Sequence, residues 1–387
     1  FENPYVDAKK AEKTMHSPKA QALALQAARE GIILLKNDDN LLPLSKNLKS
    51  IAVIGPLADA PRDQLGDYTP KYIRHEIITP LKGIQTKMAQ GTNIRYVKGV
   101  EVLDPEFDQI EDAVAAAKNA EVALLFVGET AKCVGEKDDV ASLDLLGRQR
   151  ELIQKVEATG TPTVVILING RPLTINWTAQ HIPAVLDAWL IGEQGGYAIA
   201  DVLFGDYNPD GRLPVTIPRH AGQLPAIYFY KPSKEQRRDP GRRHTAYVDM
   251  PMDPLYEFGH GLSYTTFSYS NLNISPKSTC PDGSIRVSCD VTNTGRIAGS
   301  EVVQLYLNDL ISSVTTPIRQ LKGFEKVNLK PGETKTVTMT LSPYDLSLLD
   351  RNLERVVEPG IFEVMVGKSC EKIELRGQFE IVPVSYK

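Results

Sequence analysis

A loop rich in carboxylate side chains follows the most apolar stretch of the chain. Residues 122–127 (VALLFV) are continuously apolar, Gly128 ends the run, and the loop behind it carries Glu129, Glu136, Asp138 and Asp139. A carboxyl group can act as a nucleophile, a general acid or a general base when its surroundings tune its pKa. This loop is therefore the first place to expect a catalytic carboxyl group.

The pattern around the loop predicts the element that positions it. Apolar runs that end at glycine and lead into a helical pattern, here near Gln149, are typical of buried strands in an α/β sheet. In such sheets, ligands bind outside the carboxyl ends of the strands. The acidic loop is expected at that edge.

Strand-like and helix-like patterns alternate from residue 16 to residue 219. Further strands are predicted at 51–54, 94–97, 164–168 and 184–189, and helices at 18–31, 79–88, 104–120, 149–158 and 197–203. Ser17 is a suitable N-cap for the first helix, with Pro18 at its first position. The alternation predicts a mostly parallel sheet covered by helices on both faces. Residues 1–15 lack a clear period and are expected to form a connecting arm.

The last part of the chain has a different character. Residues 220–262 are irregular and rich in basic residues, which favours a solvated connecting segment. From residue 263 onward, short alternating segments predict strands at 285–291, 301–307, 334–341 and 361–366. Short strands separated by turns over about a hundred residues are typical of an immunoglobulin-like β-sandwich.

Composition excludes several classes of function. The chain has 387 residues, of which 42% are hydrophobic and 24% charged, with a formal net charge of -4. This balance offers no electrostatic argument for binding nucleic acid or a membrane surface. The apolar runs are too short to insert into a bilayer. The opening, FENPYVDAKK, has neither an initiator Met nor a signal pattern, so we expect a piece of a longer protein.

Cofactor sites find little support in the sequence. The four cysteines form no C-x-x-C pair, which argues against a zinc or redox centre. Cys280 and Cys289 would either pair in an oxidising compartment or remain thiols. Gly195 and Gly196 precede a helix, but no G-x-G-x-x-G or G-K-[ST] motif accompanies them. We expect neither a metal ion nor an organic cofactor.

A long polar loop offers further ligand-binding candidates. Asp59, Asp67 and His75 lie between residues 57 and 78 and would either contact a polar ligand or be solvated. Trp177 and Trp189 would either stack on a sugar or pack in the core, and their position beside apolar strands favours the core.

Four longer motifs carry a family resemblance. Residues 192–219 (GEQGGYAIADVLFGDYNPDGRLPVTIPR), 253–267 (DPLYEFGHGLSYTTF), 291–307 (VTNTGRIAGSEVVQLYL) and 319–334 (RQLKGFEKVNLKPGET) resemble glycoside hydrolase family 3, which contains β-glucosidases and β-xylosidases. The resemblance implies a linker arm at 1–15, an α/β sandwich domain at 16–219, a connecting segment at 220–262 and a fibronectin III-like domain at 263–387. The family's TIM-like barrel, which carries the aspartate nucleophile, has no counterpart in this sequence.

The resemblance also implies roles for the acidic loop. Its position points to Glu136 as the general acid/base, with Glu129 as the alternative, and to Asp67 and Asp139 as substrate-binding residues. The family commonly has Asp-Arg and Leu-Pro-Gly where this chain has Asp139-Val140 and Leu145-Leu146-Gly147.

The expected function is that of the C-terminal part of a retaining exo-β-glycosidase, of β-glucosidase type. The chain would be inactive alone and would act on a β-linked oligosaccharide or glucoside together with a barrel domain of the same protein or of another chain. The sequence does not decide whether the chain forms a homodimer. A bacterial periplasmic or extracellular location is expected. The alternative is a non-catalytic carbohydrate-binding or scaffold protein, which a barrel encoded upstream or a co-purifying barrel chain would exclude.

Overall fold

The computed structural model describes residues 2–69, 76–232 and 247–383, so His75 lies outside the described residues. The chain divides into two compact units, residues 1–211 and 212–387. An α/β unit thus precedes an all-β unit, as the sequence patterns predict.

A six-stranded sheet forms the centre of the first unit. Its strand order is β1-β6-β5-β4-β2-β3. The strands are β1 (Ile33–Asn37), β2 (Ser50–Ile54), β3 (Asn93–Val97), β4 (Val122–Gly128), β5 (Thr163–Ile168) and β6 (Ala184–Asp187). All neighbouring pairs are parallel except β1 and β6. The central strands β4 and β5 are buried throughout, which explains their continuous apolar sequences.

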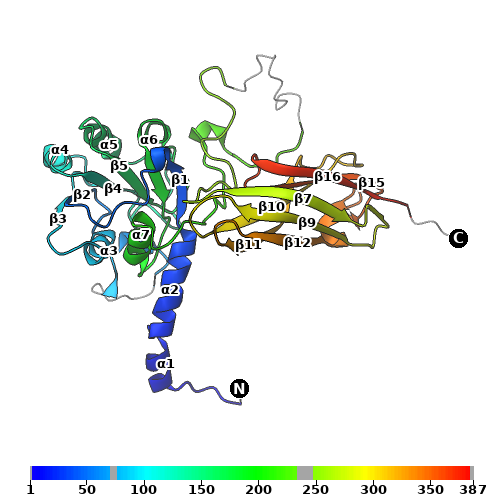
Figure 1. Ribbon diagram of the computed structural model, residues 1–387, viewed down its shortest axis with the longest axis horizontal. Coiled ribbons are helices and arrows are strands. Elements are labelled where there is room, and N and C mark those ends of the chain that lie inside the picture. Colours follow the sequence, from blue (N-terminus) through cyan, green and yellow to red (C-terminus); the bar gives the residue numbers. More distant parts are fainter. Residues whose placement is uncertain (1, 70–75, 233–246, 384–387) are drawn as a thin grey trace. The chain divides into compact units, whose positions relative to one another are not determined.

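Helices cover both faces of this sheet (Figure 1). The helices of the first unit are α1 (Ala8–Thr14), α2 (Pro18–Gly31), α3 (Pro80–Lys87), α4 (Ile110–Lys118), α5 (Gln149–Glu157), α6 (Asn176–His181) and α7 (Gly195–Leu203), with short 3-10 turns at Asp38–Asn40 and Asp63–Leu65. Helices α4 and α5 pack on one face, and α3 and α7 pack on the other. The predicted two-sided α/β arrangement is confirmed.

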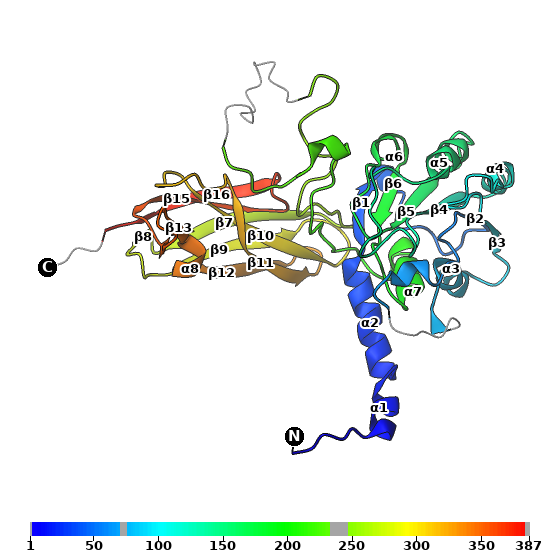
Figure 2. The same ribbon diagram turned by 180° about the vertical axis from the view of Figure 1, so that it is seen from behind.

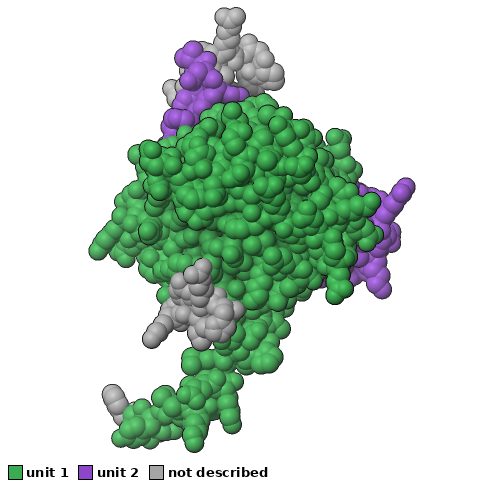
Figure 3. Space-filling model, turned by 90° about the vertical axis from the view of Figure 1, so that its left-hand side faces the viewer, with its two compact units in different colours: residues 1–211 green, residues 212–387 purple. Residues whose placement is uncertain are grey.

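Of the two N-terminal helices, α2 was predicted and α1 was not. Helix α2 begins at Pro18, and the Ser17 hydroxyl accepts a hydrogen bond from the Ala20 amide at 3.3 Å. Residues 8–14, expected to be a connecting arm, form helix α1, because Asp7 caps it by accepting from the Lys10 amide at 3.1 Å. Helix α1 has no buried residue and extends from the unit in the space-filling view (Figure 3).

The second unit is a β-sandwich (Figure 2). One sheet has the order β11-β10-β15-β16-β8, and the other has the order β12-β9-β7. Its elements are β7 (Phe267–Ser275), β8 (Ser278–Thr279), β9 (Ile285–Asn293), β10 (Gly299–Asp309), β11 (Gln320–Leu329), β12 (Thr334–Leu341), α8 (Pro343–Leu346), β13 (Leu348–Leu349), β14 (Arg355–Val356), β15 (Gly360–Gly367) and β16 (Ile373–Ile381), after a 3-10 turn at Ala221–Gln223. Buried side chains of both sheets form one core.

The cysteines do not form the disulfide considered from the sequence. Cys280 is exposed and donates its thiol proton to Asp282 Oδ1 at 2.8 Å. Cys289 is buried in the core of the sandwich, where burial raises its thiol pKa to about 11. Of the two alternatives left open by the sequence, the structure shows free thiols at Cys280 and Cys289.

Candidate active site

The acidic loop leaves the carboxyl end of β4 and returns to the sheet through α5. Gln149, fully buried at the start of α5, accepts from the Gly128 amide at 2.8 Å and donates to the Gly128 carbonyl at 2.9 Å. It also donates to the Leu146 carbonyl at 3.0 Å. One amide side chain thus joins the two ends of the loop.

Glu129 is buried and its carboxylate is held from two sides. Arg171 Nε lies 3.1 Å from Glu129 Oε1, and the Gly170 amide donates to Oε2 at 3.0 Å. Burial raises the pKa of Glu129, while the hydrogen bond from Gly170 and the charge of Arg171 oppose that shift. Both oxygens therefore bind groups of the same unit.

Glu136 has the opposite environment. It is exposed, and the Tyr68 hydroxyl lies 3.5 Å from its Oε2 in a geometry that allows donation. Tyr68 itself is 78% exposed. A carboxyl group on the surface of a fixed loop, beside a hydroxyl and an exposed aromatic ring, has the access to solvent and ligand that proton transfer requires.

The polar loop after β2 meets the acidic loop. A Cβ atom on Gly135, whose φ is +132°, would lie 2.4 Å from Asp67 Oδ2, so the two loops touch there. The Ala131 amide donates to Asp63 Oδ1 at 2.9 Å. Arg62 in turn donates to Thr69 Oγ1 and to the Asp67 carbonyl. Two segments far apart in the sequence therefore hold each other in place.

The predicted site residues separate into two groups. The structure brings Glu136 and Asp67 together where the two loops meet, whereas Glu129 is enclosed in its ion pair. Asp139 lies on the same loop and is exposed. The sequence analysis missed Tyr68 and Arg171. The adjacency of Tyr68 to Asp67 and the position of Arg171 just after a buried strand were the available signals.

A buried carboxyl group lies at the same edge of the sheet. Asp187 ends β6, is 2% exposed, and accepts from the Trp189 amide at 3.2 Å. Burial raises its pKa to about 7, although hydrogen bonds from Trp189 and Asn169 oppose the shift. Asp187 should therefore keep its proton to a higher pH than an ordinary aspartate does.

The two tryptophans do not form a common aromatic surface. Trp177 stacks on His181 within α6, with ring centroids 4.2 Å apart. Trp189 is half-buried with a φ of 54°, an uncommon backbone conformation for a bulky residue. Within the described parts of the chain, its buried indole N–H has no hydrogen-bond partner.

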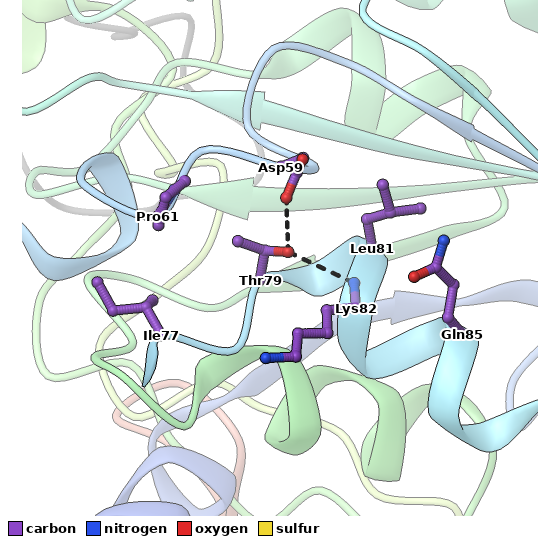
Figure 4. A pocket seen from close by; sticks show the side chains of 7 residues that line it. All are labelled: Asp59, Pro61, Ile77, Thr79, Leu81, Lys82 and Gln85. Carbon is purple, nitrogen blue, oxygen red and sulfur yellow. Dashed lines mark hydrogen bonds between the residues drawn. The ribbon is translucent and has the colours of Figure 1, made fainter. Parts of the chain in front are cut away.

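A separate pocket of about 480 Å³ lies at the start of α3 (Figure 4). It is lined by Asp59, Pro61, Ile77, Thr79, Leu81, Lys82 and Gln85. The Thr79 hydroxyl donates to Asp59 Oδ1 at 2.8 Å and accepts from the Lys82 amide, as Figure 4 shows. Asp59, one of the sequence candidates, thus belongs to this pocket and has an internal partner.

Two classes of feature are missing from the residues that the structure describes. No group of three or more His, Cys, Asp and Glu side chains there could hold a metal ion. In the same residues, no helix is both long enough and apolar enough to cross a membrane.

Two family models match the chain. The model described as glycosyl hydrolase family 3 C-terminal domain matches residues 32–264. The model described as fibronectin type III-like domain matches residues 301–370.

Curated relatives and solved structures similar to this chain include proteins named beta-glucosidase or beta-xylosidase. A beta-xylosidase of Formosa agariphila is 41% identical over 362 residues, covering 91% of this chain and 49% of the relative. A periplasmic beta-glucosidase of Salmonella typhimurium is 39% identical, covering 96% of this chain and 51% of the relative. The structure of a beta-glucosidase from Listeria innocua in complex with glucose is 34% identical, with a TM-score of 0.88, over 97% of this chain and 51% of that one. The chain spans about half the length of the curated relatives it matches.

Proposed function

Because the chain belongs to glycosyl hydrolase family 3, we propose that it forms the C-terminal part of a retaining exo-β-glycosidase of β-glucosidase type. It supplies the general acid/base, Glu136. The nucleophile comes from a barrel domain outside these 387 residues, either in the same protein or in a separate chain.

Retention requires two carboxyl groups on opposite sides of the scissile bond, about 5–5.5 Å apart. The barrel carboxylate attacks the anomeric carbon while protonated Glu136 donates its proton to the leaving oxygen. Glu136 then accepts a proton from the water that hydrolyses the glycosyl-enzyme. Its exposed position suits this exchange, because the carboxyl group is open both to the leaving oxygen and to the attacking water.

The contrast between Glu136 and Glu129 carries the assignment. Both carboxylate oxygens of Glu129 are engaged by Arg171 and Gly170, and Glu129 is 2% exposed. Glu136 is exposed beside the Tyr68 hydroxyl. A group that must first give and then take a proton needs the accessible position, which supports Glu136.

The substrate is a β-linked sugar at the non-reducing end of an oligosaccharide or glucoside. Relatives named beta-glucosidase and beta-xylosidase support this class of substrate. We favour glucosides because the Salmonella and Listeria proteins carry that name. The name of the Salmonella protein also supports an exported, periplasmic location.

The test uses this chain joined to, or combined with, its barrel domain. Glu136→Ala should lower turnover of aryl β-glucosides with poor leaving groups by about 10²–10⁴-fold, the usual contribution of a general acid. On aryl β-glucosides with good leaving groups, hydrolysis of the glycosyl-enzyme should limit turnover of this variant, and added azide should restore it and yield a β-glycosyl azide, because azide needs no general base. Lys132→Ala, also at an exposed position of the same loop, is the control and should keep the leaving-group dependence of the wild type.

Two results would contradict the proposal. Near-wild-type activity of Glu136→Ala on poor leaving groups would remove Glu136 from the role and return it to Glu129 or to the barrel. Sugar binding without hydrolysis by the complete wild-type protein would favour a carbohydrate-binding function instead.

A further inference from the structure

We propose that Arg171 is a positioning residue that sets the place of the Glu136 carboxyl group through the backbone of the acidic loop. This inference rests on the proposed role of Glu136. Arg171 does not contact the Glu136 side chain in the structure. Its effect passes through the two peptide carbonyls that flank Glu136.

The guanidinium of Arg171 binds both sides of the segment that carries Glu136. Its Nη2 donates to the Cys133 carbonyl and, at 3.0 Å, to the Asp138 carbonyl. These carbonyls lie three residues before and two residues after Glu136. The planar, multidentate guanidinium fixes the direction of each bond, which the single ammonium of a lysine would not do.

Glu129 fixes the guanidinium in turn. Arg171 Nε lies 3.1 Å from Glu129 Oε1, and the second carboxylate oxygen accepts from the Gly170 amide. The arginine is therefore held at the ends of β4 and β5, two central strands of the sheet. Through Arg171, the buried Glu129 would thus help to orient the exposed Glu136.

A packing contact supports the same arrangement independently of the hydrogen bonds. A Cβ atom on Gly170 would lie 2.2 Å from Val134 Cγ1, so the loop rests directly on the backbone at the end of β5. Val134 is 7% exposed and lies two residues before Glu136. Val134 thus packs against the end of β5, and Arg171 binds the backbone of the loop on both sides of Glu136.

Loss of this support should affect proton donation more than the other steps. Displacement of a catalytic group by about 1 Å can cost about 10²-fold in rate. Good leaving groups need little protonation, so their glycosides should react almost normally with a displaced acid. Arg171→Met should therefore lose about 10²-fold in kcat/KM on poor leaving groups and much less on dinitrophenyl β-glucoside.

The experiment compares Arg171→Met, Arg171→Lys and the control Arg148→Met in the protein completed by its barrel domain. Arg148 serves as control because it pairs with Asp108 and Glu151 at the other end of the acidic loop. For each variant, kcat/KM is measured over a series of aryl β-glucosides, and amide hydrogen exchange is measured in peptides covering 130–140 and 149–157. Both Arg171 variants should show a steeper leaving-group dependence and faster exchange in 130–140. Arg148→Met should show the leaving-group dependence of the wild type and the wild-type rate of amide exchange in 130–140.

An equal loss on all substrates, or unchanged exchange in 130–140, would overturn the positioning role. If Arg171→Met does not fold, Arg171→Lys carries the test, because it keeps the charge beside Glu129 and loses the fork. Failure of this inference is separable from failure of the proposed function. In the first case Glu136→Ala still loses poor-leaving-group activity and responds to azide, and in the second case it does neither.

Discussion

Burial raises the pKa of two carboxyl groups at the carboxyl edge of the sheet, Asp187 and Glu129. Asp187 is buried with neutral hydrogen-bonding partners, and its pKa rises to about 7. Glu129 is equally buried, but the charge of Arg171 and the Gly170 amide stabilise its carboxylate. Glu136 stays in contact with solvent. Of the three acids, only Glu136 is therefore exposed to solvent.

The raised pKa of Asp187 predicts a pH-dependent stability. Since its folded pKa of about 7 exceeds the unfolded value of about 3.9, folding takes up a proton between these values and stability falls as pH rises through them. From about pH 5 to about pH 7.5 this group should cost roughly 2–3 kcal/mol of the free energy of unfolding. Urea unfolding at both pH values should show that loss in the wild type and its disappearance in Asp187→Asn. An identical pH dependence in the two proteins would contradict the prediction.

Only part of the site was predictable at the level of single residues. The pattern of apolar strands followed by polar loops indicated the two loops that carry Glu136 and Asp67, and the family resemblance singled out Glu136 among the carboxyl groups of the acidic loop. Tyr68 and Arg171 could not be assigned contacts, because their partners lie 68 and 33 or more residues away in the sequence. Such contacts depend on which loops the sheet order brings together, and periodicity carries no information about that order.

Local sequence signals predicted where a helix begins, but they did not predict which distant strands pair. The start of α2 follows from Ser17 and Pro18, whose capping interactions are local. Helix α4 begins at Ile110, six residues later than expected, because the Asp108 carboxylate accepts from the Ile110 amide and residues 104–109 form a turn region. The antiparallel place of β1 beside β6 could not be predicted, because its partner is distant in the chain.

Three helices of the first unit are joined by one buried carboxylate. Asp201 on α7, whose side chain is 2% exposed, forms ion pairs with Arg29 of α2 and Lys87 of α3. Lys87 also lies 2.8 Å from Asp206, whose side chain is 34% exposed. Asp201 therefore ties α2 to the helices that cover the sheet, while Asp206 adds a pairing at the surface.

Asp201→Ala should strongly destabilise the first unit. Loss of the Asp201 carboxylate removes charge-assisted hydrogen bonds to Arg29 and Lys87, which are themselves partly exposed, and should cost about 1.5–3 kcal/mol. Asp206→Ala is the matched control, since exposed pairs contribute about 0–1 kcal/mol. Urea unfolding followed by far-UV circular dichroism measures both. Similar costs for the two variants would mean that Asp201 contributes no more than a surface pair.

The proposed function implies that this chain is inactive alone. It spans about half the length of its curated relatives, and the function proposed above needs a nucleophile from outside residues 1–387. A dinitrophenyl 2-deoxy-2-fluoro-β-glucoside traps the glycosyl-enzyme on the nucleophile of a retaining glycosidase. Mass spectrometry of the completed protein should find the label in the barrel and none in residues 1–387. The isolated chain should neither hydrolyse aryl β-glucosides nor become labelled, and a label within the chain would contradict the division of roles.

The pairing of β1 with β6 has a consequence for folding during translation. Ile33 pairs with Asp187, so the first strand cannot join the sheet until more than 150 further residues have been translated. At about 5–20 residues per second, this wait lasts roughly 8–30 s. Throughout it, the apolar side chains of Ile33, Leu34 and Leu35, all buried in the finished fold, lack their partner strand. The first strand therefore stays without its hydrogen-bonding partner until synthesis has passed residue 187.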